Sequence, residues 1–152
     1  MNKILIFDDR YQIRNYLQDE LKLENFECEL VKDIYGADEH MEKEMDNISS
    51  IILDIMMPSL GLNDEERTLS KAGTLTGWVW LWYHQNQNKQ KPHPLADKKI
   101  IIYSAFLNDF NLYIESNQPS DDEKRFADKV FKISKETTED KVIEEMAAII
   151  RD

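Results

Sequence analysis

The chain has 152 residues, of which 41% are hydrophobic and only four each are glycine and proline, a composition that predicts one globular domain and excludes a disordered chain. Thirty acidic residues against nineteen basic ones give a formal net charge of −11, which argues against direct nucleic-acid binding. The single Cys28 excludes an internal disulfide, and no apolar run approaches the roughly 18 residues of a membrane span. We therefore expect a cytoplasmic protein without a membrane segment.

The first third of the chain predicts alternating strands and helices. Lys3–Phe7 is an apolar strand that runs into Asp8 and Asp9, and residues 11–23 carry a helical apolar stripe. Residues 26–31 alternate with period two, as a half-exposed edge strand does. A helix over about 37–46 follows, and Ile48–Leu53 then forms a strand buried on both faces that ends in Asp54.

Residues 59–76 show no strand pattern and are long for a connection, so we expect an insertion between the third strand and the third main helix. Within it, Asn63 and Glu66 have the spacing of a capping box that begins a short helix. Residues 77–87 have strand-like composition. We nevertheless predict a helix there, because a crossover must join the parallel strands on either side.

The last third predicts two more strands. Residues 99–103 form a fourth strand that ends at Ser104, followed by a helix over 106–116 and a polar loop over 117–123. Residues 129–133 form a short fifth strand, and Thr137 or Thr138 can cap a final helix.

This alternation predicts an α/β fold with a doubly wound parallel sheet covered by helices on both faces. We expect the flavodoxin-like (βα)5 arrangement with strand order 2-1-3-4-5, which places the first and third strands side by side. Asp8, Asp9 and Asp54 then meet at the carboxyl edge of the sheet.

Three carboxylates within about 5 Å repel one another by roughly 3 kcal/mol per pair at an effective dielectric near 20. Such a cluster raises a pKa or binds a cation, and hard oxygen ligands without cysteine or histidine point to Mg²⁺. A carboxylate can also carry a phosphoryl group as an acyl phosphate. Ser104 and Lys132, near the ends of the fourth and fifth strands, could supply the donors that such a group needs.

These motifs, in their order along the chain, resemble the receiver domain of two-component response regulators. The segments that carry the resemblance are IFDDR, LDIMMP, YSA and VFK, and together they span most of the chain. The resemblance implies that Asp54 accepts phosphate from a histidine kinase or a phosphotransfer protein, and that the domain then acts on a downstream protein. It further implies Mg²⁺ held by Asp9, Asp54 and the Met56 carbonyl, with Asp8 contributing through water. Ser104 and Lys132 would contact the phosphoryl group.

Some residues depart from the family pattern. Ile133 stands where the family usually has proline after the lysine, and Lys129 occupies the approximate position of its switch aromatic. The alternative is therefore a degenerate receiver that acts as a phosphorylation-independent interaction module. A metal-dependent phosphohydrolase needs a D-x-D arrangement, whereas Asp8 and Asp9 are adjacent, so we expect no enzyme. Arg67, in the expected insertion, is a candidate for touching the phosphoryl group.

Overall fold

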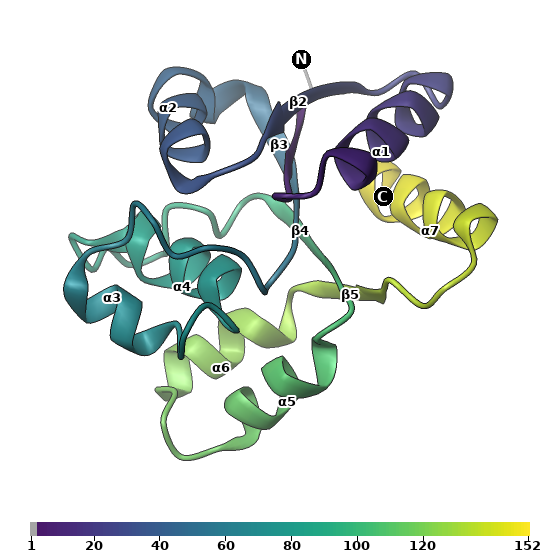
Figure 1. Cartoon of the computed structure of the whole chain (residues 1–152). Coiled ribbons are helices and arrows are strands. Elements are labelled where there is room, and N and C mark those ends of the chain that lie inside the picture. Colours follow the sequence, from purple (N-terminus) through teal and green to yellow (C-terminus); the bar gives the residue numbers. More distant parts are fainter. Residues whose placement is uncertain (1–2) are drawn as a thin grey trace.

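The computed structural model describes residues 3–152 and contains a five-stranded parallel sheet (Figure 1). Its order is β2-β1-β3-β4-β5, as predicted for a doubly wound flavodoxin-like fold. The strands are β1 (Lys3–Phe7), β2 (Glu27–Val31), β3 (Ile48–Leu53), β4 (Lys99–Ser104) and β5 (Phe131–Ser134).

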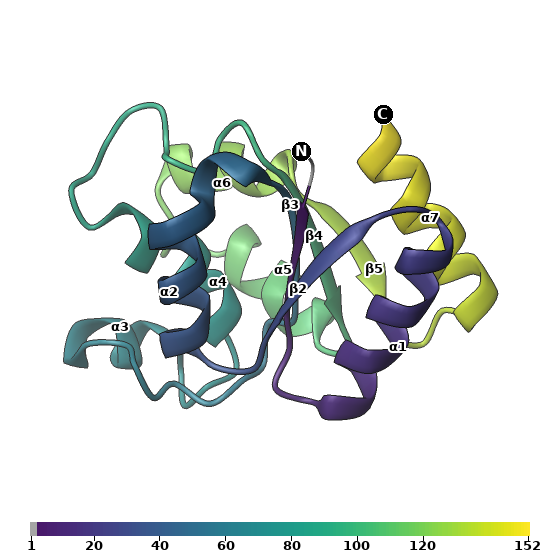
Figure 2. The ribbon, with the colours of Figure 1, turned by 90° about the horizontal axis from the view of Figure 1, so that it is seen from above.

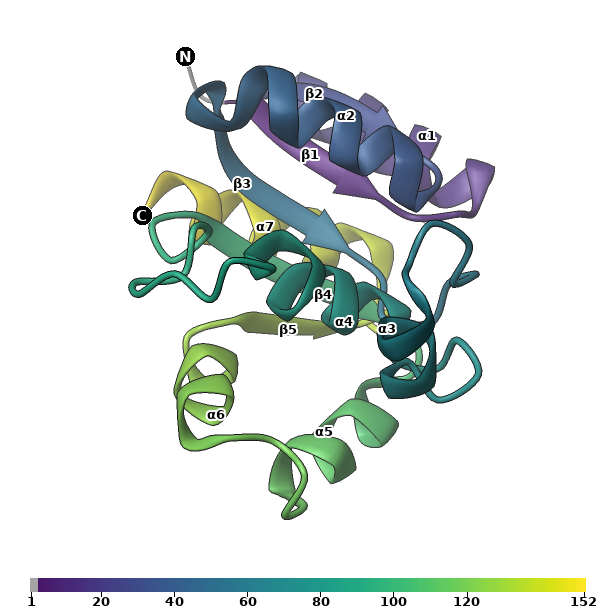
Figure 3. The same cartoon turned by 90° about the vertical axis from the view of Figure 1, so that its left-hand side faces the viewer.

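Helices cover both faces of the sheet, which is the arrangement that parallel strands require. Viewed along the sheet, α1 and α7 lie on one side, and α2, α4 and α6 lie on the other (Figures 2 and 3). The helices are α1 (Tyr11–Leu23), α2 (Ile34–Glu44), α3 (Asp64–Leu69), α4 (Thr76–Trp82), α5 (Leu107–Glu115), α6 (Asp121–Asp128) and α7 (Glu139–Arg151). Among residues 3–152, no helix is long and apolar enough to cross a membrane.

The core divides into two apolar clusters because successive strand residues point to opposite faces. Leu5 and Leu53 pack toward α2, α4, α5 and α6, whereas Ile6 and Ile52 pack toward α1 and α7. The central strands are thus buried on both sides, which explains their uninterrupted apolar sequence.

Helix α4 forms in a segment whose composition is typical of a strand, as its place between two parallel strands predicts. Thr76–Trp82 is helical, and a 3-10 turn over His84–Asn86 continues it, close to the predicted range of 77–87. Trp78 and Trp80 are fully buried beneath the helix, whereas Trp82 is only half-buried. Tertiary packing therefore overrides the β-propensity of the aromatic run.

Helix α6 is absent from the sequence prediction, which placed a loop over 117–123 and a strand from residue 129. Ser120 caps this helix by accepting a hydrogen bond from the Glu123 backbone, and Lys129 ends it. Strand β5 consequently begins at Phe131 and extends to Ser134. Because the strand ends one residue later than predicted, Lys135, and not Lys132, is the lysine at its carboxyl end.

Candidate functional site

Two neighbouring strands bring the predicted carboxylates together. Asp8 follows the last residue of β1 and Asp54 follows the last residue of β3, and Phe7 pairs with Leu53 in the parallel register. The Asp54 backbone nitrogen also donates to the Phe7 carbonyl at 3.1 Å. Carboxylate oxygens of Asp8, Asp9 and Asp54 lie within 4.8 Å of one another, as the sequence predicted.

The surrounding backbone orients these carboxylates. Asp54 Oδ1 accepts a hydrogen bond from the Ile55 backbone at 2.7 Å, and Asp8 Oδ1 accepts one from the Arg10 backbone at 2.9 Å. Asp8 and Asp54 are only 3% and 5% exposed, whereas Asp9 faces solvent. Burial raises the pKa of Asp8, although the hydrogen bond from Lys135 partly opposes this shift. The cluster therefore favours a bound cation.

Lys135 supplies that positive charge. Its Nζ lies 2.8 Å from Asp8 Oδ2 and 2.8 Å from Asp54 Oδ2, and its backbone nitrogen donates to the Ser104 carbonyl at 3.1 Å. Burial lowers the pKa of the ammonium, but the hydrogen bonds to Asp54 and Asp8 outweigh this effect and raise it overall. Lys135 is therefore a charged bridge between the two buried carboxylates.

The structure does not place Lys132 at the site, and the expectation that it would lie beside Asp54 is wrong. Strand β5 ends at Ser134, so Lys135 is the first residue beyond it. The Lys132 side chain is exposed and lies over the ring of Phe110, 5.6 Å from the ring centre. Neighbouring residues of a strand point to opposite faces of the sheet. Because the Ile133 side chain is buried on the face covered by α1 and α7, the Lys132 side chain points to the other face.

A cavity of about 490 Å³ opens beside Asp54. It is lined by Asp9, Asp54, Met56, Phe106 and Lys135 among others, so the predicted Met56 lies at the same cavity as the carboxylates. Ser104 is the last residue of β4 and is fully buried, and its Oγ accepts a hydrogen bond from the Phe106 backbone at 3.0 Å.

Part of the 59–76 segment borders this cavity. Ser59, Ala72 and Gly73 line it, and the Met57 backbone donates to the Gly73 carbonyl at 3.3 Å. Arg67 is exposed on α3 and is not among the lining residues, so the structure does not bring it to Asp54. Asn63 and Glu66 do form the predicted capping box at the start of α3.

Helix α4 contacts the segment that follows β3 through Gly77. Its backbone nitrogen donates to the Ile55 carbonyl at 2.8 Å. A Cβ placed on Gly77 would lie 1.9 Å from the Asp54 carbonyl oxygen, so only glycine permits this approach. The residue supports the backbone that aims Asp54 into the cavity.

The donor set fits a small divalent cation such as Mg²⁺, because it consists of carboxylate oxygens and stands beside an open cavity. Asp8, Asp9 and Asp54 would hold the ion, and Met56 borders the same cavity. Lys135 adds a second positive group. Such an edge can bind an incoming phosphoryl group and neutralise its oxygens.

The strand order and the helices on both faces are those of the receiver fold of response regulators, and this chain has that fold. A chemotaxis response regulator of Vibrio cholerae matches with a TM-score of 0.62 at 17% identity, covering 98% of each chain. A response regulator from Thermotoga maritima matches with a TM-score of 0.59 at 15% identity, covering 100% of this chain and 99% of its own. A receiver domain protein from Clostridium thermocellum has a TM-score of 0.57 at 18% identity, covering 99% and 95%. No protein-family model and no curated protein sequence matches the chain.

Proposed function

We propose that this chain is a response-regulator receiver that accepts a phosphoryl group on Asp54 and signals by binding another protein. The observation that carries this proposal is the convergence of Asp8, Asp9, Asp54 and Lys135 at one edge of the sheet. The backbone hydrogen bonds on Asp8 and Asp54 hold these groups in place before any ligand arrives. Preorganised charges of this kind stabilise phosphoryl transfer without further rearrangement.

In the proposed transfer, a phosphohistidine of a kinase or phosphotransfer protein is the donor. Asp54 Oδ2 attacks phosphorus, the phosphorus–nitrogen bond breaks, and the electron pair returns to the imidazole of the donor. Oδ2 suits this role because Oδ1 is occupied by the Ile55 backbone, whereas Oδ2 accepts a hydrogen bond from Lys135 Nζ alone among residues 3–152. Bound Mg²⁺ would supply further charge to neutralise the phosphoryl oxygens. Lys135 would then pair with those oxygens instead of Asp8, and Ser104 offers a buried hydroxyl on the neighbouring strand end.

The domain is proposed as a signalling module and not as an enzyme with a small-molecule substrate. Its partners would be a histidine kinase or a phosphotransfer protein and a downstream protein, in the cytoplasm and without direct contact to nucleic acid. The net charge of −11 supports the last point, because it repels phosphate backbones.

One observation favours a second candidate, a degenerate receiver that binds its partner without phosphorylation. Lys135 already bridges Asp8 and Asp54 at 2.8 Å, so the two buried carboxylates are compensated without a phosphoryl group. In that case the domain would hold one conformation regardless of phosphate donors.

Incubation with acetyl phosphate and Mg²⁺, followed by intact-protein mass spectrometry, tests both candidates. We expect the wild type to gain one phosphoryl group, Asp54→Ala to gain none, and Asp109→Ala, which removes an exposed acid from α5, to behave as the wild type. A folded wild type that stays unlabelled would overturn the phosphoacceptor proposal and leave the degenerate receiver.

A further inference from the structure

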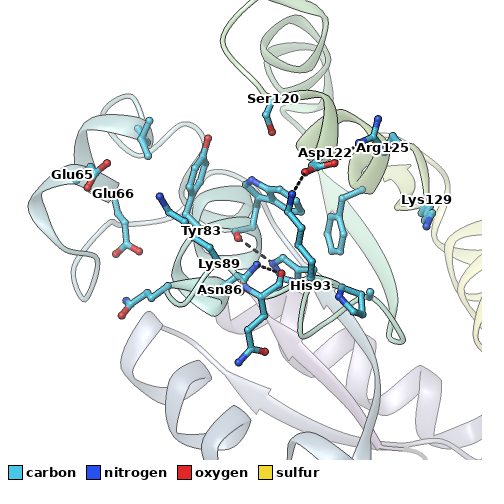
Figure 4. Close-up of a pocket in the computed structure, with 18 of the residues that line it drawn as sticks. Glu65, Glu66, Tyr83, Asn86, Lys89, His93, Ser120, Asp122, Arg125 and Lys129 are labelled. Carbon is cyan, nitrogen blue, oxygen red and sulfur yellow. Dashed lines mark hydrogen bonds and ion pairs between the residues drawn. The ribbon is translucent and has the colours of Figure 1, made fainter.

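A second and larger cavity, of about 720 Å³, lies between α3, the segment that follows α4, and α6 (Figure 4). It shares no lining residue with the cavity beside Asp54. Its volume falls within the range of about 300–1,000 Å³ that is typical of small-molecule sites. The proposed phosphorylation chemistry does not use this cavity.

Flat rings form one part of the cavity. Trp82, Tyr83, His93 and Phe126 all line it. The rings of Trp82 and His93 stack with centres 5.0 Å apart and planes 14° apart, and Phe126 lies 4.7 Å from His93. Stacked rings of this kind offer a platform for another planar group.

The His93 ring is uncharged, and hydrogen bonds at both ring nitrogens fix its orientation. Its Nδ1 accepts a hydrogen bond from the Leu95 backbone at 3.0 Å, so its Nε2 carries the proton and donates to the Trp82 carbonyl at 3.1 Å. Burial lowers the pKa of His93, which keeps the ring uncharged near neutral pH. The Tyr83 hydroxyl is likewise occupied, because it donates to Glu123 at 2.8 Å. Trp82 and Tyr83 are half-buried, so parts of their rings are open to a ligand, whereas the buried His93 and Phe126 support the Trp82 ring from within.

Polar side chains form the rest of the lining. The amides are Asn63, Asn86, Gln87 and Gln90. Asn63 and Asn86 are occupied by the α3 cap and by the Gln90 backbone. The Gln90 side-chain amide has no hydrogen-bond partner among residues 3–152, so it can pair with the edge of a heteroaromatic ring.

The charges around the cavity leave positive groups without partners. Asp122 is paired with Lys91 at 3.3 Å and also with Arg125, and Glu66 is paired with His84. Lys89 and Lys129 are exposed lining residues that form no ion pair within the described part of the chain, and Glu65 is the one lining acid without such a pair there. Figure 4 shows Lys89 near Tyr83 and Asn86 on one side of the cavity, and Lys129 on the opposite side, at the end of α6. The unpaired charge at this cavity is thus positive, although the whole chain carries −11.

We propose that this cavity binds a planar heteroaromatic ring carrying an anionic group, of which a nucleoside monophosphate is the simplest biological form. The ring stacks on the open part of the half-buried Trp82 indole, which His93 and Phe126 support, and Gln90 bonds its polar edge. The anionic group pairs with Lys89 or with Lys129, which lie on different sides of the cavity. The ligand needs both parts, because the aromatic residues supply stacking and the lysines supply charge.

Calorimetric titration with AMP, adenosine and inorganic phosphate tests this directly. We expect saturable binding of AMP, with adenosine and phosphate each at least about tenfold weaker. The double variant Lys89→Gln/Lys129→Gln should bind AMP about tenfold more weakly and adenosine unchanged. The matched control is Lys141→Gln, which removes an exposed lysine from α7 on the other side of the sheet and should leave AMP binding unchanged. Nuclear magnetic resonance should show the largest indole shift at Trp82, since Trp78 and Trp80 are fully buried.

Three results would overturn the proposal: no saturable binding of AMP up to about 5 mM, equal binding of adenosine and AMP, or an equal loss in the double variant and in Lys141→Gln. Both lysines in the double variant are exposed, and circular dichroism verifies that the variants are folded. The titrations contain neither Mg²⁺ nor acetyl phosphate. Their outcome is therefore independent of whether Asp54 accepts phosphate.

Discussion

Replacing Gly77 with alanine should lower the stability of the protein and displace the segment that carries Asp54. The added Cβ would lie 1.9 Å from the Asp54 carbonyl oxygen, 2.9 Å from its carbonyl carbon and 3.1 Å from the Ile55 Cα. All three atoms are backbone, so no side chain can rotate away. Since carbon atoms pack comfortably at about 3.5 Å, α4 and the segment after β3 must separate by more than about 1 Å.

This separation has two measurable consequences. Overpacking against rigid backbone in a buried position, together with strain on the Gly77–Ile55 hydrogen bond, should lower the free energy of unfolding by about 3 kcal/mol. A misplacement of about 1 Å at a reacting group can lower a rate by about 100-fold, so phosphorylation of Asp54 by acetyl phosphate should slow markedly. Urea denaturation followed by circular dichroism measures the first effect, and time-resolved intact mass measures the second.

Gly36→Ala is the matched control. Gly36 is the third residue of α2, and its added Cβ would be 3.7 Å from Val31 and 3.3 Å from the capping oxygen of Asp33, which would shift by a few tenths of an ångström. Alanine is favoured over glycine in a helix by up to about 1 kcal/mol, which offsets the cost of this shift, so the variant should unfold within about 1 kcal/mol of the wild type. If Gly77→Ala unfolds within about 0.5 kcal/mol of the wild type, the close-approach reasoning is wrong.

Three further predictions concern the site and its surroundings. Lys135→Gln should lower the rate of Asp54 phosphorylation at least tenfold, whereas Lys132→Gln should leave it unchanged. Time-resolved intact mass measures both rates, and equal effects of the two substitutions would contradict the placement of Lys135 beside Asp54. Hydrogen bonding to Asp38, and then to Glu66, against an opposing effect of burial, raises the pKa of His84 to about 9. The stabilisation by protonated His84 should therefore be complete below about pH 6.5 and lost as the pH rises through 9. Over that range, the free energy of unfolding of the wild type should fall by about 1–2 kcal/mol more than that of His84→Gln, as urea titrations will measure. Parallel pH profiles of the two proteins would refute this. The bulky Phe106 at the cavity beside Asp54 should keep hydrolytic water away, so Phe106→Ser should shorten the lifetime of the acyl phosphate, measured by loss of label, and an unchanged lifetime would contradict this.

Much of the fold could be predicted from local patterns. Residues 4–7 and 51–53 are apolar without interruption because the central strands are buried on both faces, and acids follow each run directly. The Asn63–Glu66 capping box was also recognisable, because it depends only on residues three apart. Helix α6 was not predicted because its mostly polar sequence resembles that of a loop. The burial of Phe126 and Glu123, which marks it as a packed helix, depends on contacts with distant parts of the chain.

The acidic half of the site was predictable and its basic half was not. Asp8, Asp9 and Asp54 follow long strands whose ends are plain in the sequence. Lys132 and Lys135 both lie near the end of a four-residue strand, and the sequence alone does not decide where that strand ends. The pairing of Ser104 with Ser134 decides it, and this pairing places Lys135 beside Asp54.

By itself, the sequence determined an α/β fold with acids at the ends of its buried strands, because buried strands and their terminal acids leave a local signature. Only the tertiary structure decided that Lys135 is the cation between Asp8 and Asp54, that Gly77 supports the Asp54 backbone, and that a second cavity with stacked rings lies by α6. These features depend on register and on contacts between residues far apart in the chain. A one-residue change of register reverses the direction of every side chain in a strand, and no local pattern records it.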